Sequence, residues 1–438
     1  MSDRTYDLLQ SGSRQDDFQN GARATLWTQA QRDIAARAYE NIIDIIGLEN
    51  IKLLLPLWET TYTGAGAAEF SDMIRPHIKF TGSGIALGNA GLLNPVPYFN
   101  GTSSQIVQKA LVEATAGSTE FAVNNATFKI AQKVTAYTLF GDIKTVQMKL
   151  KKTGSPVADM VIELVEDNAG EPTGATVATT EVQLASDVLA TSGLFGFCFA
   201  NAYNCGGTKT YWLVFKYSAT TTIGVGDYIS VIYDNAGAYG QPNATWNGAA
   251  WTVNAGQSCP FKVYDDSLTV AGDHSIIAAF SVYSTSTNMS IVQPTPGHVI
   301  TNGGGLIYGA APNSKALKAY ACGGGTVDIT KSIVLPPYPM LEIASKTFSY
   351  NEVSEKHKLY RGTELLASGS GTGLTGANNP RQAFVVGAAR NATNFTYYSW
   401  HNGTVGPVIM TSTVLTQREI GQIVNQLQAF RRVNYGGV

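Results

Sequence analysis

The sequence has few charged residues for its length. Lys, Arg, Asp and Glu make up 14% of the 438 residues, whereas soluble proteins average about 25%. The formal net charge is −2, so the composition predicts no basic surface for nucleic acid or for an anionic membrane. Hydrophobic residues at 44% are sufficient for a folded core, which excludes a disordered chain.

Long hydrophobic runs are also absent. The segment Ile51–Trp58 is interrupted by Lys52 and Pro56, and no run approaches the about 20 residues of a membrane-spanning helix. The residues after Met1 are polar and do not resemble a secretory signal. We expect a protein that is made in the cytoplasm and does not insert into a membrane.

The sequence contains few of the motifs that mark catalytic or metal sites. Its four cysteines form no C-x-x-C pair, no two of its five histidines have zinc-site spacing, and no G-x-S-x-G elbow occurs. The G-x-G-x-x-G match at 371–376 is followed by Asn-Asn-Pro, which disfavours the helix of a dinucleotide site. We expect no enzyme and no cofactor. For Cys198 and Cys205, reduced thiols and a short-loop disulfide both stay open.

Glycine and aromatic residues are abundant instead. The chain has 45 Gly, 21 Tyr and 17 Phe, and short alternating segments are separated by turn clusters. No strand–helix–strand rhythm is present, so sandwiches or barrels are expected. The segments predicted as strands are 51–55, 146–151, 160–165, 211–217 and 228–233.

Helical periodicity appears near the N-terminus. Trp27, Ile34, Ile42 and Ile45 recur at helical spacing, and Gly47 follows as a natural stop. Two interpretations stay open for this helix. It packs on its own domain, or these four residues anchor the chain to a partner.

A second helix is predicted at the C-terminus. Thr416 and Glu419 form a T-x-x-E capping box. The residues that follow define one apolar face, formed by Ile420, Ile423, Val424, Leu427 and Phe430.

Three stretches resemble the concanavalin A-like, laminin-G-type jelly roll. They are 51–57 with 71–72 and 97–101, the K-L-Y-R-G-T-E-L segment at 358–365, and the closing pattern 384–387, 402–409 and 415–420. Between them, the segments 146–156, 171–174 and 210–214 resemble a carbohydrate-binding-module-type jelly roll. Such modules occur in structural proteins of tailed bacteriophages.

The resemblance implies an all-β chain of two nested jelly-roll β-sandwiches with an N-terminal arm and helix and a C-terminal helix. An arm and attachment helix would occupy 1–48. One sandwich would comprise 49–111 plus 266–438, and the other, 112–265, would be inserted into one of its loops. Long insertions are tolerated where their ends lie close together.

An aromatic cluster in the inserted segment suggests a glycan site. Tyr233, Asp234, Tyr239, Trp246 and Trp251 surround a loop rich in Asn and Gly. Exposed aromatic faces would stack on sugar rings, while Asp and Asn would hold hydroxyl groups. The alternative is that the two tryptophans fill the core. If Asn247-Gly248 is a hairpin tip, both indoles stand on one rim.

A weak metal candidate follows the inserted segment. Asp265, Asp266 and Asp273 lie where the chain returns to the outer sandwich, and such carboxylates can hold calcium. Solvated turn acids are the alternative. The calcium-site spacing of some laminin-G-type domains is missing.

Together, the composition and the resemblance imply a non-enzymatic virion structural protein of a tailed phage. It would be a capsid decoration, head-fibre or tail-fibre subunit, located in the virion after synthesis in the host cytoplasm. Its partners would be other virion proteins, copies of itself and host-surface glycans. The alternatives are a free bacterial lectin or adhesin and a glycan-cleaving enzyme, which would need a cleft with paired carboxylates.

Overall fold

The protein is all-β, as predicted, with two α-helices among the residues described. The computed structural model describes residues 29–57, 61–62, 68–76, 78–87, 97–135, 142–205, 209–218, 223–264, 273–282, 289–293, 306–311, 314–320, 328–332, 342–349, 357–369, 384–390, 397–398 and 400–434. Every strand ladder in these ranges is antiparallel. Neither helix is long and apolar enough to span a membrane within the part described.

Two large sheets and one small one are formed by strands from the two ends of the sequence. The eight-stranded sheet has the order β28 (Glu364–Gly369), β27 (His357–Arg361), β26 (Glu342–Phe348), β21 (His274–Phe280), β32 (Asn402–Thr411), β6 (Pro97–Asn100) and β5 (Ala86–Leu87), with β1 (Ile51–Leu55) also on β32. The nine-stranded sheet has the order β2 (Thr61–Tyr62), β3 (Ala68–Ser71), β4 (Lys79–Ser83), β7 (Gln105–Gln108), β29 (Val385–Val386), β22 (Met289–Gln293), β23 (Leu306–Ala311), β24 (Ser314–Tyr320) and β25 (Asp328–Ser332). A small ladder joins β30 (Ala389–Arg390) to β31 (Tyr397–Tyr398).

Two further sheets are formed by the strands between residues 112 and 264. The seven-stranded sheet has the order β13 (Thr176–Thr179), β12 (Asp159–Glu166), β16 (Thr210–Tyr217), β10 (Lys129–Thr135), β18 (Asn243–Trp246) and β19 (Trp251–Asn254), with β14 (Gln183–Leu184) on β12. The six-stranded sheet has the order β8 (Val112–Ala114), β20 (Phe261–Tyr264), β11 (Asp142–Thr153), β17 (Tyr228–Tyr233) and β9 (Thr119–Val123), with β15 (Gly193–Asn204) on β11.

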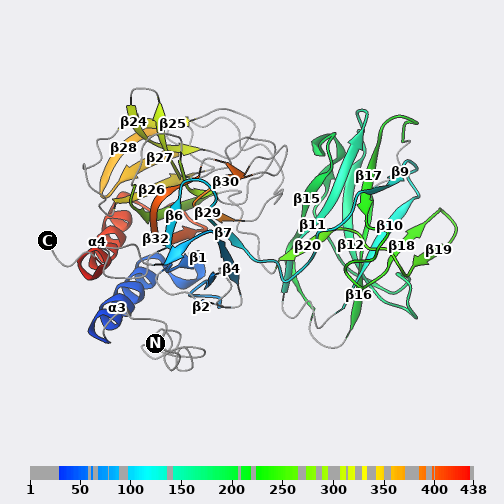
Figure 1. Cartoon of the computed structure of the whole chain (residues 1–438), viewed down its shortest axis with the longest axis horizontal. Helices are drawn as coiled ribbons and strands as arrows, with labels where there is room; N and C mark the ends of the chain where they lie inside the picture. Colours follow the sequence, from blue (N-terminus) through cyan, green and yellow to red (C-terminus); the bar gives the residue numbers. More distant parts are fainter. Residues whose placement is uncertain are drawn as a thin grey trace.

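The strands therefore form two lobes, which we name the outer sandwich and the inserted sandwich (Figure 1). The chain enters the inserted sandwich through β8 and leaves it through β20. These two strands pair with each other, with Val112 opposite Val263. The two connections to the outer sandwich thus begin side by side, which is the geometry that a loop insertion requires.

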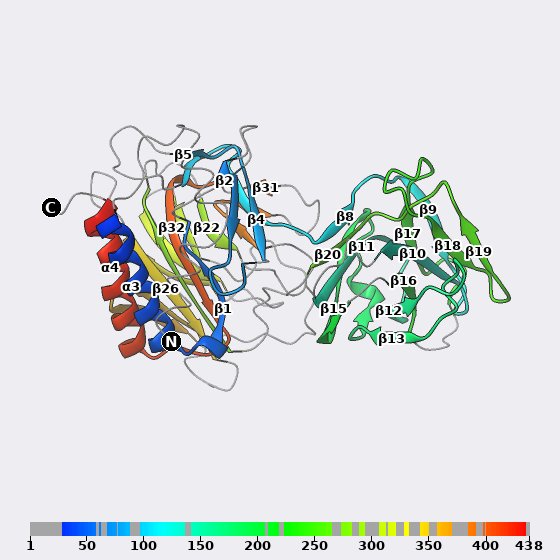
Figure 2. The same ribbon diagram turned by 90° about the horizontal axis from the view of Figure 1, so that it is seen from below.

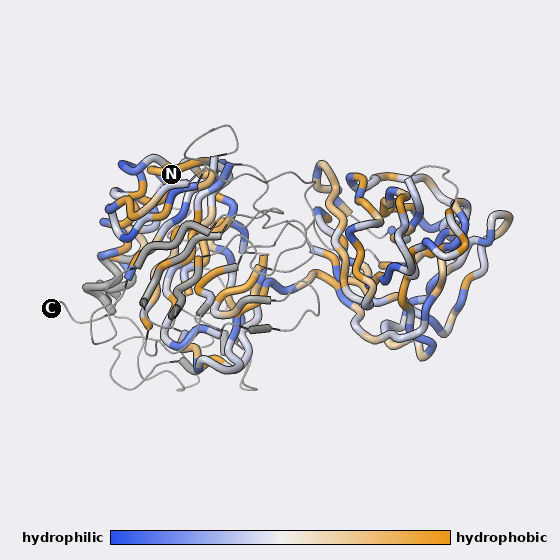
Figure 3. Tube along the Cα trace, turned by 90° about the horizontal axis from the view of Figure 1, so that it is seen from above, coloured by the Kyte–Doolittle hydropathy of each residue, from blue (hydrophilic) through white to orange (hydrophobic). Residues whose placement is uncertain are grey.

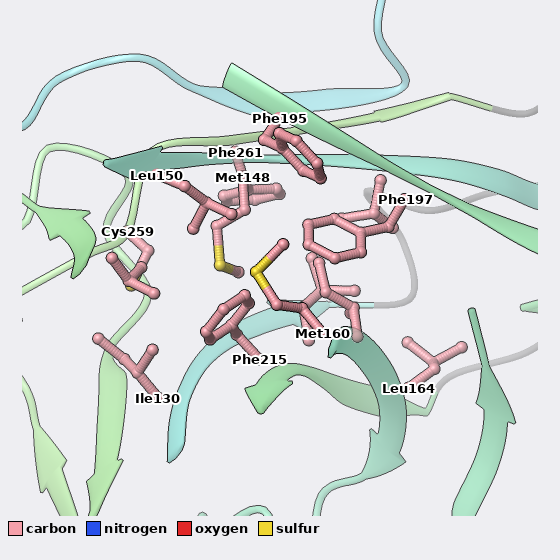
Figure 4. Close-up of a cluster of buried hydrophobic side chains, with 14 of the residues drawn as sticks. Ile130, Met148, Leu150, Met160, Leu164, Phe195, Phe197, Phe215, Cys259 and Phe261 are labelled. Atoms are coloured by element: carbon pink, nitrogen blue, oxygen red, sulfur yellow. The ribbon is translucent and has the colours of Figure 1, made fainter. Parts of the chain in front are cut away.

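Each sandwich has its own hydrophobic core. The core of the inserted sandwich is built from alternate residues of its strands. In β16 these residues are Tyr211, Leu213, Phe215 and Tyr217. Figure 4 shows Phe215 packed there among Met148, Met160, Phe197 and Phe261, and hydrophobic stretches follow the strands of both lobes in Figure 3. The outer sandwich has a separate core between its two large sheets, formed by residues such as Phe80, Phe99, Ile276 and Val408.

Both helices cover the outer face of the eight-stranded sheet. α3 (Gln29–Ile46) and α4 (Gln417–Asn434) lie side by side in Figure 2, on the side of the outer sandwich away from the inserted one. They are joined by a hydrogen bond from Asn41 to Gln426. Two short 3₁₀ turns, Leu48–Asn50 and Ala185–Asp187, complete the helical structure described.

The predicted helix signals are confirmed. The backbone N–H of Thr416 donates to Glu419, and the N–H of Glu419 donates back to the Thr416 hydroxyl, at 2.7 and 3.2 Å. At the other end, α3 stops before Gly47, whose φ of 81° suits glycine. The N–H of Gly47 closes the last turn onto Ile43 at 2.8 Å.

The anchoring interpretation of the first helix is wrong for Ile42. Its side chain is fully buried with Tyr39 against Ile277 and Ile409 of the eight-stranded sheet, because the apolar face of α3 covers its own domain. Ile45 packs half-buried on the same cluster. Ile34 is 46% exposed, and Trp27 lies outside the described residues.

Three of the four cysteines carry reduced thiols. Cys198, Cys205 and Cys259 are buried and unbridged, so the disulfide alternative for Cys198 and Cys205 is wrong. Burial raises the pKa of Cys259 to about 12, which keeps this thiol protonated. Cys322 lies outside the described residues.

Candidate functional site

The β18–β19 hairpin places two indoles opposite each other at the edge of the seven-stranded sheet. Trp246, the last residue of β18, pairs directly with Trp251, the first residue of β19. The turn between them begins at Asn247, whose side-chain oxygen accepts hydrogen bonds from the N–H groups of Ala249 and Ala250 at 3.0 and 3.1 Å. Gly248 has a φ of 99°, a conformation that disfavours any other residue.

The indole pair lies on the outer face of the sheet, outside the main core. The ring centres of Trp246 and Trp251 are 5.5 Å apart at 53°, and both side chains are half-buried. Trp251 packs on a small cluster on that outer face, formed by Ala131, Val165, Trp212, Val214 and Ala244. The alternative that these two tryptophans fill the main core is therefore wrong.

A lysine extends the aromatic pair into a row across three strands. Lys129 of β10 lies directly opposite Trp246, and directly opposed residues share one face of a sheet. Its ammonium is 6.0 Å from the centre of the Trp246 ring. Next along β19 on the same face, Val253 is 38% exposed. The row therefore combines two partly exposed indoles, an aliphatic side chain and one cation.

A neighbouring turn adds polar groups to this row. Asn125 accepts hydrogen bonds from the backbone N–H and the hydroxyl of Thr127 at 2.9 and 3.0 Å. A Cβ placed on Gly248 would approach the Thr127 hydroxyl to 3.1 Å, so this turn lies against the hairpin tip. Asn124, Asn125, Thr127 and Asn247 are all exposed and supply the kind of groups that hold sugar hydroxyls.

The third tryptophan of the sheet is not available for a ligand. Trp212 is fully buried, and its indole N–H donates to Asp167 at 2.7 Å. Lys133 lies over its ring at 5.4 Å and pairs with the same carboxylate. Burial alone would raise the pKa of Asp167, but the hydrogen bonds from Lys133 and Trp212 outweigh it and hold the pKa below its usual value.

The other three predicted glycan residues do not join the indole pair. The Asp234 carboxylate accepts hydrogen bonds from the N–H groups of Ala236 and Ala238, at 3.2 and 2.9 Å, within its own loop. Tyr239 packs edge-on against Phe261 of the core at 5.0 Å.

Tyr233 also packs partly buried on that core, at the end of β17. The backbone of Asp234 pairs with Ser258, next to the base of the β18–β19 hairpin. From this base, where Asn243 pairs with Asn254, Trp246 and Trp251 are three residues farther along β18 and β19. Three residues of a strand span about 10 Å.

The structure does not test the three calcium candidates as a group. Asp265 and Asp266 lie outside the described residues, and Asp273 is exposed just before β21. Within the residues described, no group of three or more His, Cys, Asp or Glu side chains lies close enough to hold an ion.

The outer sandwich contains buried histidines that pack in its interior. His401 is fully buried, and its Nε2–H donates to the backbone oxygen of Ser281 at 2.9 Å. Burial lowers the pKa of His401 to about 4. His357 is also fully buried, and burial, followed by the charge of Lys346, holds its pKa well below the usual value. Both rings are therefore neutral at pH 7.

The two indoles could be found from local sequence, whereas Lys129 and the 125–127 turn could not. These residues are far from the hairpin in sequence, and only the pairing of β10 with β18 brings them together. One local feature pointed to Lys129. Side chains alternate along β10, so that Lys129, Ala131 and Lys133 lie on one face of the sheet.

Comparisons with known proteins give weak likenesses. No protein-family model and no curated protein matches the chain. Among solved structures, a sialidase from Trypanosoma rangeli is 10% identical with a TM-score of 0.30, covering 83% of this chain and 68% of that one. Domain 4 of AbnA, a GH43 extracellular arabinanase from Geobacillus stearothermophilus, in complex with arabinotriose, is 12% identical with a TM-score of 0.26, covering 44% and 80%.

A further solved structure is described only as a receptor binding domain. It is 15% identical with a TM-score of 0.26. The chain spans 36% of its length. TM-scores this low do not establish a shared fold or a shared activity.

Proposed function

We propose that the chain is a non-enzymatic structural and adhesion protein of a tailed-phage virion, and that its inserted sandwich binds surface glycans through Trp246 and Trp251. The observation that carries the binding part is the position of these indoles. They form a partly exposed pair at a hairpin tip, at the edge of the seven-stranded sheet as far as the structure describes it. Figures 1 and 2 both place β19 at the end of the inserted sandwich that is farthest from the outer sandwich.

Stacking explains how such a pair would bind a sugar. The apolar face of a pyranose ring fits an indole, and the exposed amides and hydroxyls of the neighbouring turns would hold its hydroxyl groups. Binding at one such site is weak. A particle that carries many copies converts weak sites into strong attachment, provided that the spacing allows several to engage together.

The virion assignment rests on the sequence resemblance and on the arrangement of the two sandwiches. The helix pair and the aromatic hairpin lie at opposite ends of the molecule (Figure 2). In this proposal the helix end attaches to the particle and the hairpin end faces outward. On the helix side, Ile34 of α3 is an exposed apolar residue and would contact other virion proteins or another copy.

The glycan part is tested with Trp246→Ala and a matched control, Thr252→Ala. Thr252 is exposed on the same hairpin, and it points to the other face because it alternates with Trp251. We expect Trp246→Ala to lose binding on a glycan array and on host cells. Its melting temperature should fall only slightly, because a cross-strand aromatic pair contributes about 0.5 to 1.5 kcal/mol. Thr252→Ala should bind as the wild type does. Unchanged binding by Trp246→Ala would refute the site.

The virion part is tested by mass spectrometry of purified particles. We expect the chain to be present, and its copy number to separate a decoration protein from a fibre subunit. Glycan binding by a chain that is absent from particles would favour the alternative of a free bacterial lectin or adhesin. Release of sugar from a bound glycan would favour a glycan-cleaving enzyme.

A further inference from the structure

The lysines of the inserted sandwich show what kind of sugar its hairpin would bind. Residues 112–264 contain nine lysines and no arginine or histidine. Five lysines pair with carboxylates, namely Lys133 with Asp167, Lys151 with Glu120, Lys209 with Glu166, Lys216 with Glu163, and Lys262 with Glu113. Three others donate to backbone oxygens, namely Lys144 to Ala200, Lys149 to Gly117 and Lys152 to Ser186.

Lys129 is the exception among these nine. Within the described residues it has neither a carboxylate nor a carbonyl partner, and its ammonium lies only over the Trp246 ring, at 6.0 Å. That distance is at the outer limit of a cation–π contact, so the indole holds the ammonium weakly. The parts of 112–264 that are not described, 136–141, 206–208 and 219–222, contain no Asp or Glu that would supply a partner.

One acid on the same face is already neutralised. Glu163 lies two strands away from Lys129, and its carboxylate is bound to Lys216 at 2.6 Å. The site therefore combines two indoles with one ammonium that has no ion pair among the described residues and lies over the Trp246 ring.

We infer that the β18–β19 hairpin binds an acidic sugar, with the ring on Trp246 and Trp251 and the ring carboxylate on the ammonium of Lys129. This inference rests on the proposed function and adds the substrate class. A hydrogen bond between an ammonium and a carboxylate is about twice as strong as a neutral one, so an acidic ring gains affinity that a neutral ring lacks. A single cation fits one charged sugar. It does not fit a nucleic acid, which needs several phosphate contacts.

The test uses the full chain on an array that carries neutral glycans and their uronic-acid counterparts. The best uronate glycan and its methyl ester, which keeps the ring and removes the charge, are then titrated. We expect the acid to bind about tenfold more tightly than the ester, and added salt to reduce this difference.

Two lysine variants complete the design. Lys129→Gln should bind the acid as weakly as the wild type binds the ester, with its affinity for the ester unchanged. Lys144→Gln is the matched control, because it removes the same charge from the six-stranded sheet, and it should bind as the wild type does. Trp246→Ala should lose both ligands.

The outcomes separate the two proposals. Equal affinity for acid and ester, or a Lys129→Gln variant that retains the preference for the acid, would overturn the inference and leave glycan binding intact. Tighter binding to single-stranded DNA than to any glycan would overturn it as well. Binding to no glycan on the array would overturn the proposed function together with the inference.

Discussion

The two sandwiches are both β-sandwiches with their own hydrophobic cores, but they differ in the polar groups that they bury. The inserted sandwich contains no histidine, whereas all five histidines of the chain lie outside residues 112–264. In the outer sandwich, three histidines and Lys346 are buried in or beside the cores. The inserted sandwich instead keeps its charges in exposed or half-buried pairs such as Lys216–Glu163. The outer sandwich therefore buries two histidines, His357 and His401, that are neutral when folded, and no such group occurs in the inserted sandwich.

The largest effect should come from cutting a cavity into one core at a time. Phe215→Ala in the inserted sandwich and Phe80→Ala in the outer one each remove a fully buried ring, which costs about 3 to 5 kcal/mol. Differential scanning calorimetry should show that each variant lowers one melting transition and leaves the other in place. If both transitions move together in either variant, the two cores are one cooperative unit.

The next effect should be acid sensitivity confined to the outer sandwich. The pKa of His401 falls from the usual 6.5 to about 4 in the folded state, so the unfolded chain binds the proton more readily. The stability from this group is complete above pH 6.5 and is lost as the pH falls toward 4. The loss amounts to about 3 kcal/mol at about 1.4 kcal/mol per pKa unit. His357 acts in the same direction.

Calorimetry at pH 7 and pH 4.5 tests this difference. The outer transition should fall, while the inserted one stays, because its shifted acids Glu120 and Asp167 have lowered pKa values and lose stability only below about pH 4.5. Asp72, whose pKa is raised chiefly by burial, offsets part of the loss at the acid end.

The variant His357→Leu tests whether a buried histidine causes this acid sensitivity. His357→Leu should reduce the pH dependence of the outer transition and leave the part that comes from His401, and it removes no hydrogen bond, since neither ring nitrogen of His357 has a partner among the described residues. An inserted transition that falls first between pH 7 and pH 4.5 would contradict the assignment.

A smaller effect is expected from the cap of α4. Thr416→Ala removes the hydroxyl that accepts from the N–H of Glu419, at a cost of about 1 kcal/mol. Only the outer transition should shift, because the described side chains of α4 pack on the outer sandwich. Gln428→Ala, at an exposed position of the same helix, is the control and should change neither transition. A Thr416→Ala variant with both transitions unchanged would show that the cap does not support the sheet.

The smallest effect should follow the largest change in sequence. Replacing residues 112–264 with a short Gly/Ser linker should leave the outer transition almost where it is, because β8 and β20 end side by side. Circular dichroism and calorimetry of the deletion variant provide the measurement. An unfolded product would show that the outer sandwich needs its insertion.

Strands and caps could be predicted from sequence because they depend on neighbouring residues. The alternation at 51–55 and 228–233 gave β1 and β17 with the bounds that the structure has, and the capping box gave the start of α4. The surface against which an apolar face packs could not be predicted from neighbouring residues. The apolar stripe of α3 showed that Ile42 is buried, but only the folded chain shows that it is buried against its own sheet.

The candidate site was predictable in part for the same reason. Asn247-Gly248 marks a tight turn, so the pairing of Trp246 with Trp251 follows from short-range spacing. Tyr239 and Asp234 looked similar in sequence, but the core residue Phe261 and the loop N–H groups engage them instead. The contact of Lys129 with Trp246 depends on the register of two distant strands, which no local pattern specifies.

The way in which the inserted sandwich is tethered has a mechanical consequence. The incoming connection continues from β7, an interior strand held between β4 and β29. After residues 265–272, the outgoing connection leads to β21, which is held between β26 and β32. Tension applied at the far hairpin would therefore reach both large sheets through interior strands, each secured by a ladder on either side. A lobe fastened in this way resists being pulled off better than one that hangs from an edge strand.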